Sequence, residues 1–205
     1  VIGAASGLAL MVGASVASAE MIDFTNPATG TTGSVFNGTV SWNLASDGTL
    51  TNAAAFGAAA APTVSGLSFA TNGYSVVDSA KLPRWMSLTF SAPVELNAVY
   101  FLNLFTDNGV SERVTVSVDN GSTIYTLLSS GAYQPGASGL TGGPVTPVNA
   151  TTIHFTTGGG FDGKALADGS LAGVNVAPIP VPAAGALLLG AIGGLAALRR
   201  RKKST

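Results

Sequence analysis

Acid–base, nucleophilic and metal chemistry each need particular groups of side chains, and this sequence offers few of them. Its 205 residues include one histidine, His154, and no cysteine. Thiolate zinc sites, cysteine nucleophiles and disulfides are therefore excluded, and a lone histidine without other nitrogen or sulfur ligands does not make a zinc site. Ile153 and Phe155 should point to the opposite face of a strand, which leaves His154 half exposed. No serine lies in a nucleophile-elbow context, and we predict that the protein is not an enzyme.

Two aspartates form the candidate metal site. Asp162 and Asp168 lie in the segment GGGFDGKALADG, where carboxylates and backbone carbonyls are the hard oxygen ligands that Ca²⁺ takes. Aspartate and glycine are equally typical of turns that bind nothing. A structural calcium ion is one interpretation, and a pair of turn aspartates without any cofactor is the other.

Aromatic side chains are the candidate sugar contacts. An exposed amphipathic ring offers a flat surface at low entropic cost, and sugars stack on such surfaces. The alternative for each ring is packing in the core or in a turn. The candidates are Trp42, Tyr74, Trp85 and Tyr133.

The charges are few and unevenly distributed. Only 9% of the residues are charged, against about 25% in an ordinary soluble domain. Five of the nine cations lie at 199–203, so the rest of the chain carries four cations against ten carboxylates. An acidic body without a basic face argues against nucleic-acid binding.

The region between the two ends of the chain has the alternation that is typical of strands. The clearest case is RVTVSVDNGSTIYTLL, in which Val114, Val116 and Val118 alternate with polar residues and Asp119-Asn120-Gly121 provides a hairpin turn. We expect Phe90, Val116 and Phe155 in the core. Pro93 should divide SLTFSAPVELNAVYFLNLF into two strands. Further strands are predicted at 21–24, 38–44, 48–51, 65–70, 74–77, 152–155 and 172–176.

Many short strands with glycine-rich turns and no amphipathic helix favour an all-β fold. We predict a two-sheet antiparallel sandwich, jelly-roll-like, over residues 20–177. The segment 52–62, NAAAFGAAAAP, is an exception that fits either a short helix or a surface loop.

The first 19 residues are typical of a secretory signal peptide. An apolar helical stretch precedes Ala17-Ser18-Ala19, the small-x-small pattern that a signal peptidase accepts, and Glu20 follows. We expect cleavage after Ala19. A basic n-region is missing, so residues before Val1 are expected in the full-length precursor.

The C-terminal segment 178–205 combines three features. Pro178, Pro180 and Pro182 predict an extended spacer that is incompatible with a helix. Residues 182–198 are 17 apolar positions, about 26 Å as a helix, which is near the lower limit for a transmembrane span. The stop-transfer cations Arg199, Arg200, Arg201, Lys202 and Lys203 follow and should lie in the cytoplasm.

These parts, in this order, resemble a known sorting signal. Ile179, Pro180, Val181, Pro182, Ala183, Ala184 and Gly185, followed by an apolar helix and an Arg/Lys cluster, are similar to the VPLPA-type PEP-CTERM signal, with Ile179 for Val and Val181 for Leu. The resemblance implies recognition by an exosortase, a membrane-embedded transpeptidase-like enzyme of Gram-negative bacteria that make exopolysaccharide. The alternative is a plain membrane anchor.

The body is loosely similar to the β-sandwich domains that precede such tails, in MSLTFSAPVELNAVYFLNL and in IHFTTGGGFDGKALADGSLAGVNV. We therefore predict an exported, surface-sorted, non-enzymatic protein of the cell envelope or exopolysaccharide matrix, with an inner-membrane intermediate. The expected partners are the exosortase, the membrane and exopolysaccharide. A carbohydrate-binding, lectin-like module is the alternative, and a hydrolase comes third.

Overall fold

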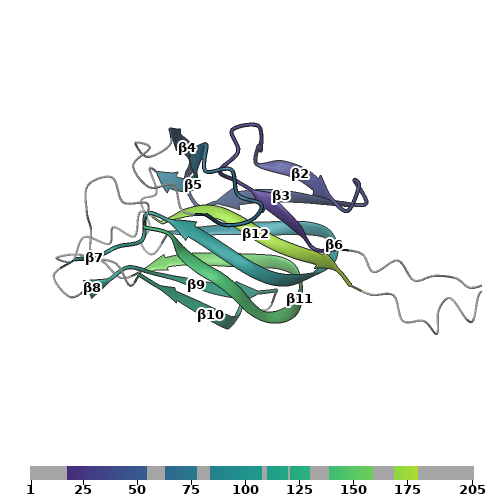
Figure 1. The fold of residues 1–205 in the computed structure, drawn as a ribbon. Coiled ribbons are helices and arrows are strands. Elements are labelled where there is room, and N and C mark those ends of the chain that lie inside the picture. The colour runs from purple at the N-terminus through teal and green to yellow at the C-terminus, as the bar shows by residue number, and fades with distance from the viewer. Residues whose placement is uncertain are drawn as a thin grey trace, which may run out of the picture. The chain divides into compact units, whose positions relative to one another are not determined.

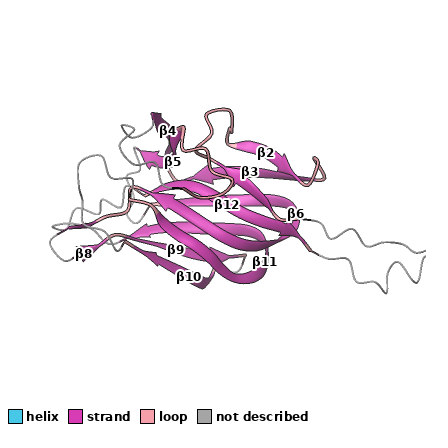
Figure 2. Cartoon of the chain, in the orientation of Figure 1, coloured by secondary structure: helices cyan, strands magenta, loops and turns pink. Residues whose placement is uncertain are grey.

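The computed structural model describes residues 18–54, 63–77, 84–107, 110–119, 121–129, 139–158 and 169–179, which belong to one compact unit, Ser18–Ile179. All regular structure within these ranges is β-strand, and every strand pairing is antiparallel (Figure 2). The prediction of an all-β antiparallel fold is therefore confirmed. The strands are β1 Glu20–Asp23, β2 Thr32–Val35, β3 Val40–Ser46, β4 Thr49–Ala54, β5 Thr71–Val77, β6 Trp85–Leu102, β7 Thr106–Asp107, β8 Val110–Ser111, β9 Arg113–Val118, β10 Ser122–Leu128, β11 Thr141–Gly158 and β12 Ser170–Pro178.

Two long strands, β6 and β11, pair with each other and organise the sheet (Figure 1). Residues 85–89 of β6 pair with 152–156 of β11, and this part continues through β9 to β10 on one side and through β3 to β2 on the other. We call it the first half-sheet. Residues 94–101 of β6 pair with 141–150 of β11, and residues 94–102 pair with β12, which also pairs with β1 and β5. With β4 beside β5, these strands form the second half-sheet.

Prolines lie where the ladder between β6 and β11 changes register. Thr89 pairs with Thr152, and the next paired residues are Val94 and Ala150. The chain therefore advances five positions on β6 but only two on β11, and Pro93 lies in the extra length of β6. Proline has no amide hydrogen to donate to a ladder, which confines it to edges and bulges. The prediction of two strands separated at Pro93 is wrong because the extended chain continues through it. Pro93 instead marks the corner at which β6 leaves β3 and joins β12.

The core lies between side chains of the two half-sheets. Phe101 of the second half-sheet meets Phe155 of the first with ring centroids 5.6 Å apart in an edge-to-face arrangement. Phe24, just after β1, meets Trp42 of β3 in the same way at 5.4 Å. The three residues that we expected in the core are buried, since Phe90 is 2% exposed and both Val116 and Phe155 are 0% exposed.

The hairpin at 113–128 is confirmed as β9 and β10, with the turn after Val118. Asp119 has a left-handed φ of 39°, and Gly121 follows at 81°. The carboxylate of Asp119 accepts hydrogen bonds from the amides of Thr151 and Thr152, at 2.9 and 2.8 Å. The turn therefore holds β11 next to the register shift between Ala150 and Thr152.

The strand predicted at 65–70 is absent from the structure. Gly66 and Phe69 have φ angles of 88° and 51°, which interrupt an extended backbone. Side chains at and just after the end of β1 bind the backbone of this segment in place of a neighbouring strand. The carboxylate of Asp23 accepts a hydrogen bond from the amide of Ser68, and the hydroxyl of Thr25 accepts one from the amide of Phe69. The segment is therefore a loop fixed to the chain after β1.

The other strand predictions identified five strands and missed three. The segments 21–24, 38–44, 48–51, 74–77 and 172–176 correspond to β1, β3, β4, β5 and β12 with shifted ends, and 152–155 is part of the much longer β11. The prediction omitted β2 and the small β7–β8 pair. In 52–62, residues 52–54 are the end of β4 and the remaining positions lie outside the described residues.

A close approach of two strands requires glycine at 142. Gly142 has a φ of 134°, and a Cβ atom there would lie 2.2 Å from the carbonyl oxygen of Val99 on β6. Any side chain at this position would therefore clash with backbone. This local demand explains why a glycine lies inside a paired strand.

The strands at the two ends of the compact unit are neighbours. β1 pairs with β12, and Glu20 lies opposite Val176. Among the described residues, no helix has the length and hydropathy needed to cross a membrane. The predicted signal segment up to Ala17 and the predicted span at 182–198 lie outside those residues.

Candidate functional site

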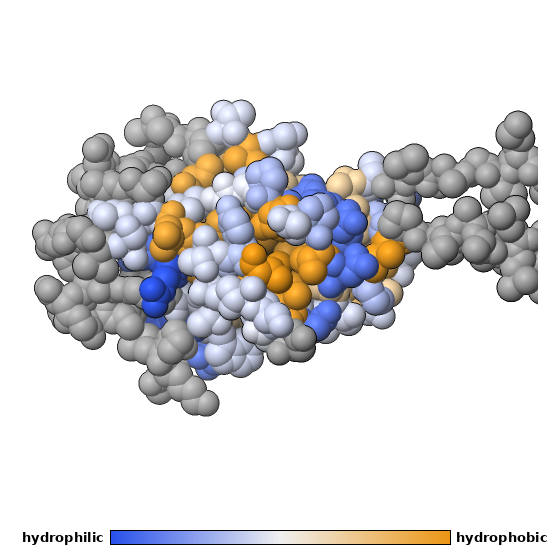
Figure 3. Space-filling model, turned by 90° about the horizontal axis from the view of Figure 1, so that it is seen from below, coloured by the Kyte–Doolittle hydropathy of each residue, from blue (hydrophilic) through white to orange (hydrophobic). Residues whose placement is uncertain are grey.

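Hydroxyl side chains cover the outer face of the first half-sheet. Met86, Leu88 and Phe90 point into the core, so the residues between them on β6 point outward. The same alternation places Thr152, His154 and Thr156 of β11 on the outer face. Viewed from the side of β9 and β10, much of the described surface has the pale colour of weakly polar residues, with apolar patches and scattered hydrophilic ones (Figure 3).

The strand register aligns these outward side chains in rows. His154 lies between Ser87 of β6 and Ser117 of β9, each in direct register with it. In the next row Thr156 lies beside Trp85. Directly opposed residues in antiparallel strands have Cβ atoms about 4.5–5.5 Å apart. The two rows are two residues apart along each strand, about 7 Å, so a ligand of that length could contact both rows.

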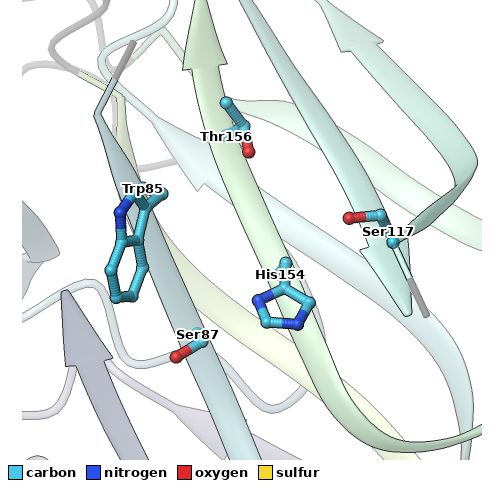
Figure 4. Close-up of a pocket in the computed structure, with 6 residues that line it drawn as sticks. Trp85, Ser87, Ser117, His154 and Thr156 are labelled. Carbon is cyan, nitrogen blue, oxygen red and sulfur yellow. The ribbon is translucent and has the colours of Figure 1, made fainter. Parts of the chain in front are cut away.

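These rows line an open depression of about 440 Å³ (Figure 4). The labelled side chains project from three adjacent strands toward the same side. Trp85 is the large ring among them and is 39% exposed. The residues that line the depression are Trp85, Ser87, Ser117, Gly121, His154 and Thr156.

The polar groups of the depression are free to bind a ligand. Within the described ranges, no hydrogen bond to protein is made by the imidazole of His154, the indole N–H of Trp85, or the hydroxyls of Ser87, Ser117 and Thr156. Farther along the same strands, by contrast, the hydroxyls of Thr89 and Thr152 lie 3.5 Å apart. The depression is therefore a place where unpaired donors and acceptors converge.

The backbone at Trp85 is fixed although its ring is exposed. The amide of Trp85 donates to the carboxylate of Asp47 at 3.2 Å, and its carbonyl accepts from the amide of Asp47 at 3.4 Å. The ladder to Thr156 holds the other side of the strand. An indole presented from such a position requires little ordering when a ligand binds.

Of the predicted sugar contacts, Trp85 has an exposed ring. Trp42 is 6% exposed and packs against Phe24, so its expected role as a surface platform is wrong. Tyr74 is half-buried, also packs against Phe24, and donates its hydroxyl to the carbonyl of Thr29 at 3.1 Å. Tyr133 lies outside the described residues.

His154 has the half-exposed position that its neighbours predicted, with Ile153 and Phe155 both buried. Neither neighbouring serine hydroxyl in the described structure donates to its imidazole, and no carboxylate lines the depression. Outside the depression, Glu112 accepts a hydrogen bond from the amide of Phe105 at 2.9 Å. The arrangement is suited to hydrogen bonding with a ligand and lacks the base–orienter contact of a catalytic triad.

Several predicted sites fall on residues that the structure does not describe. In the described ranges, no group of three His, Asp or Glu side chains is placed to hold a metal ion. Ala19 and Ile179 are described, at the two ends of the compact unit. The candidates outside are Asp162, Asp168, Ala17, Pro180, Val181, Pro182, Ala183, Ala184, Arg199, Arg200, Arg201, Lys202 and Lys203.

Sequence reasoning missed the serines and the threonine of the depression, because single hydroxyl residues in strands carry no distinguishing pattern. Tyr125 of β10 is 36% exposed but does not line the depression. In the comparisons with known proteins, the chain matches no family model, no curated protein and no solved structure.

Proposed function

We propose that the chain is an exported, non-enzymatic protein of the cell envelope or exopolysaccharide matrix whose C-terminal tail is a VPLPA-type PEP-CTERM signal processed by an exosortase. The observation that carries the proposal is the order of parts in 178–205: a proline spacer, an apolar span at 182–198 and five cations. The precursor passes through an inner-membrane intermediate before it reaches the cell surface or the extracellular matrix.

The limits of the folded unit support this division of the chain. β1 begins at Glu20, directly after the proposed cleavage site at Ala19. β12 ends at Pro178, directly before Ile179, where the similarity to the sorting motif begins. We expect this body to keep its fold when both segments are removed, because β1 and β12 pair with each other within the compact unit.

We further propose that the body is a two-sheet, jelly-roll-like sandwich. The two half-sheets share β6 and β11, each with a register shift at its corner. The contact between Phe101 and Phe155 joins their inner faces. Strands that change sheets through bulges are a common way to build such corners.

The sorting proposal is tested by replacing Pro180 and Pro182 with alanine in the full-length chain, expressed in a host that has an exosortase. A plain anchor needs length, hydropathy and cations, so the double variant would still insert. A sorting signal needs the extended spacer, and we expect the variant to remain uncleaved in the inner membrane. Pro27→Ala, in an exposed turn of the body, is the matched control.

Cell fractionation and the intact mass of the chain provide the readout. Normal cleavage and surface display of the double variant would overturn the exosortase assignment in favour of a plain anchor. Deletion of 199–203 should disturb orientation or retention under either interpretation, so the proline pair is the discriminating change.

A carbohydrate-binding module is a second candidate function. The specific observation that favours it is the exposed indole of Trp85 at the edge of a depression lined by hydroxyls. Binding of exopolysaccharide would hold an exported protein in the matrix after its tail has been removed.

A further inference from the structure

We infer that the depression beside Trp85 binds a neutral polysaccharide, with one sugar ring stacked on the indole and its hydroxyls bound along the row Ser87–His154–Ser117. This inference rests on the carbohydrate-binding function proposed above and names its site and ligand class. The shape of the depression, its charge and its hydrogen-bonding groups must all suit this ligand.

The ring of Trp85 supplies the apolar part of the site. A sugar has one face of C–H groups and a rim of hydroxyls, so it matches a surface that combines an aromatic ring with polar neighbours. Trp85 is 39% exposed and lies in register with Thr156, whose hydroxyl is on the same outer face. Aromatic rings on rigid backbone supply contact area at low entropic cost.

The row Ser87–His154–Ser117 supplies the polar part. Each serine hydroxyl both donates and accepts a hydrogen bond, and an imidazole offers two ring nitrogens. These groups make no hydrogen bond within the described protein, and adjacent strands hold them in fixed order. They are therefore preorganised for a ligand with several closely spaced hydroxyls.

The charge of the site selects a neutral polymer. Among the described residues that line it, none is aspartate, glutamate, lysine or arginine. An acidic polysaccharide would find no guanidinium or ammonium with which to pair, and the body carries more carboxylates than cations. Nucleic acid is disfavoured for the same reason.

The position of the site keeps it accessible in a protein held at its ends. Pro178 of β12 pairs with Val94 in the second half-sheet, whereas Trp85 is the first residue of β6 and lies in the first half-sheet. Val94 follows Trp85 by nine positions, at most about 30 Å along an extended chain. The depression therefore lies in a different half-sheet from the strand end that leads to the predicted sorting signal.

The two tryptophans allow a direct test on the full-length chain, purified in a detergent that contains no sugar. Trp42 is buried, so quenching of fluorescence by acrylamide reports chiefly on Trp85. We expect a neutral polysaccharide such as dextran, galactomannan or laminarin to reduce quenching and to bind in calorimetry. Alginate, an acidic polymer, is the charged comparison and should do neither.

Two variants locate the site. Trp85→Ala should weaken calorimetric binding about tenfold or more, the range typical of an aromatic anchor. Tyr125→Ala removes a ring of similar exposure, 36%, that does not line the depression, and should bind like the parent chain. Ser117→Leu places a large apolar side chain in the depression from β9 and should weaken binding at least as much as Trp85→Ala does. Thermal unfolding of each variant verifies that it is folded.

The inference is overturned if none of the three neutral polymers binds, if alginate is the polymer that binds, or if Tyr125→Ala lowers affinity as much as Trp85→Ala. These results are independent of tail processing, because the binding assay uses no exosortase. If the tail is removed normally but no polysaccharide binds, the sorting proposal stands and the binding site fails. If polysaccharide binds but the tail is not processed, the binding site stands and the sorting proposal fails.

Discussion

Truncating Phe155 to alanine should destabilise the body more than most single changes. The ring is 0% exposed, lies on β11 opposite Met86 and Val116, and meets Phe101 edge-to-face at 5.6 Å. Removing a buried phenylalanine costs about 3–5 kcal/mol, and the lost aromatic pair places this site toward the upper part of that range. For a unit of this size, about 4–5 kcal/mol lowers the melting temperature by about 8–20 °C.

Far-UV circular dichroism during thermal and urea unfolding measures the change. The urea midpoint should fall while the slope m is retained, since the surface exposed on unfolding is nearly the same. Thr156→Ala, at the next position but on the outer face, is the control and should change the free energy of unfolding by about 0.5 kcal/mol or less. An unchanged melting curve for Phe155→Ala would mean that the inner face was misassigned and that His154 points inward.

Two further predictions concern the region near the start of the body. Thr25→Val keeps the shape of a side chain that is 0% exposed but leaves the amide of Phe69 without its acceptor at 2.8 Å, so we expect a loss of about 1–3 kcal/mol in denaturant unfolding. A stability equal to that of the parent would contradict this and show that the hydrogen bond contributes little. Signal cleavage after Ala19 should make Glu20 the N-terminus of the exported form in peptide mass spectrometry, and recovery of peptides that contain residues 1–19 from that form would contradict it.

Alternation in the sequence predicted much of the local structure because it reflects which face of a strand is buried. Val114, Val116 and Val118 identified β9 and its inner face. The same reasoning distinguishes the buried tryptophan, Trp42, from the exposed one, Trp85. Trp42 lies on the same face of its strand as the apolar Val40 and Leu44, whereas Trp85 lies on the opposite face from Met86 and Leu88. Trp42 could therefore have been removed from the candidate sugar contacts, and Trp85 kept, from the sequence alone.

Proline and glycine were harder to interpret because their effect depends on pairing with distant residues. Local sequence predicts a strand break at Pro93, yet this proline lies at a corner where one continuous strand changes partners. Gly142 is required by the carbonyl of Val99, a contact between segments that are far apart in sequence. Neither role can be derived from neighbouring residues.

The candidate site itself depends on register, which no local pattern determines. Ser87, His154 and Ser117 come from three strands and share a row only because β11 shifts register between Ala150 and Thr152. Asp119 stabilises that shift through its hydrogen bonds to the amides at 151 and 152. A slip of one residue would exchange the two faces of the strand, placing Phe155 in the depression and His154 in the core. The turn that was easiest to predict from the sequence therefore holds in place the row of side chains that was hardest to predict.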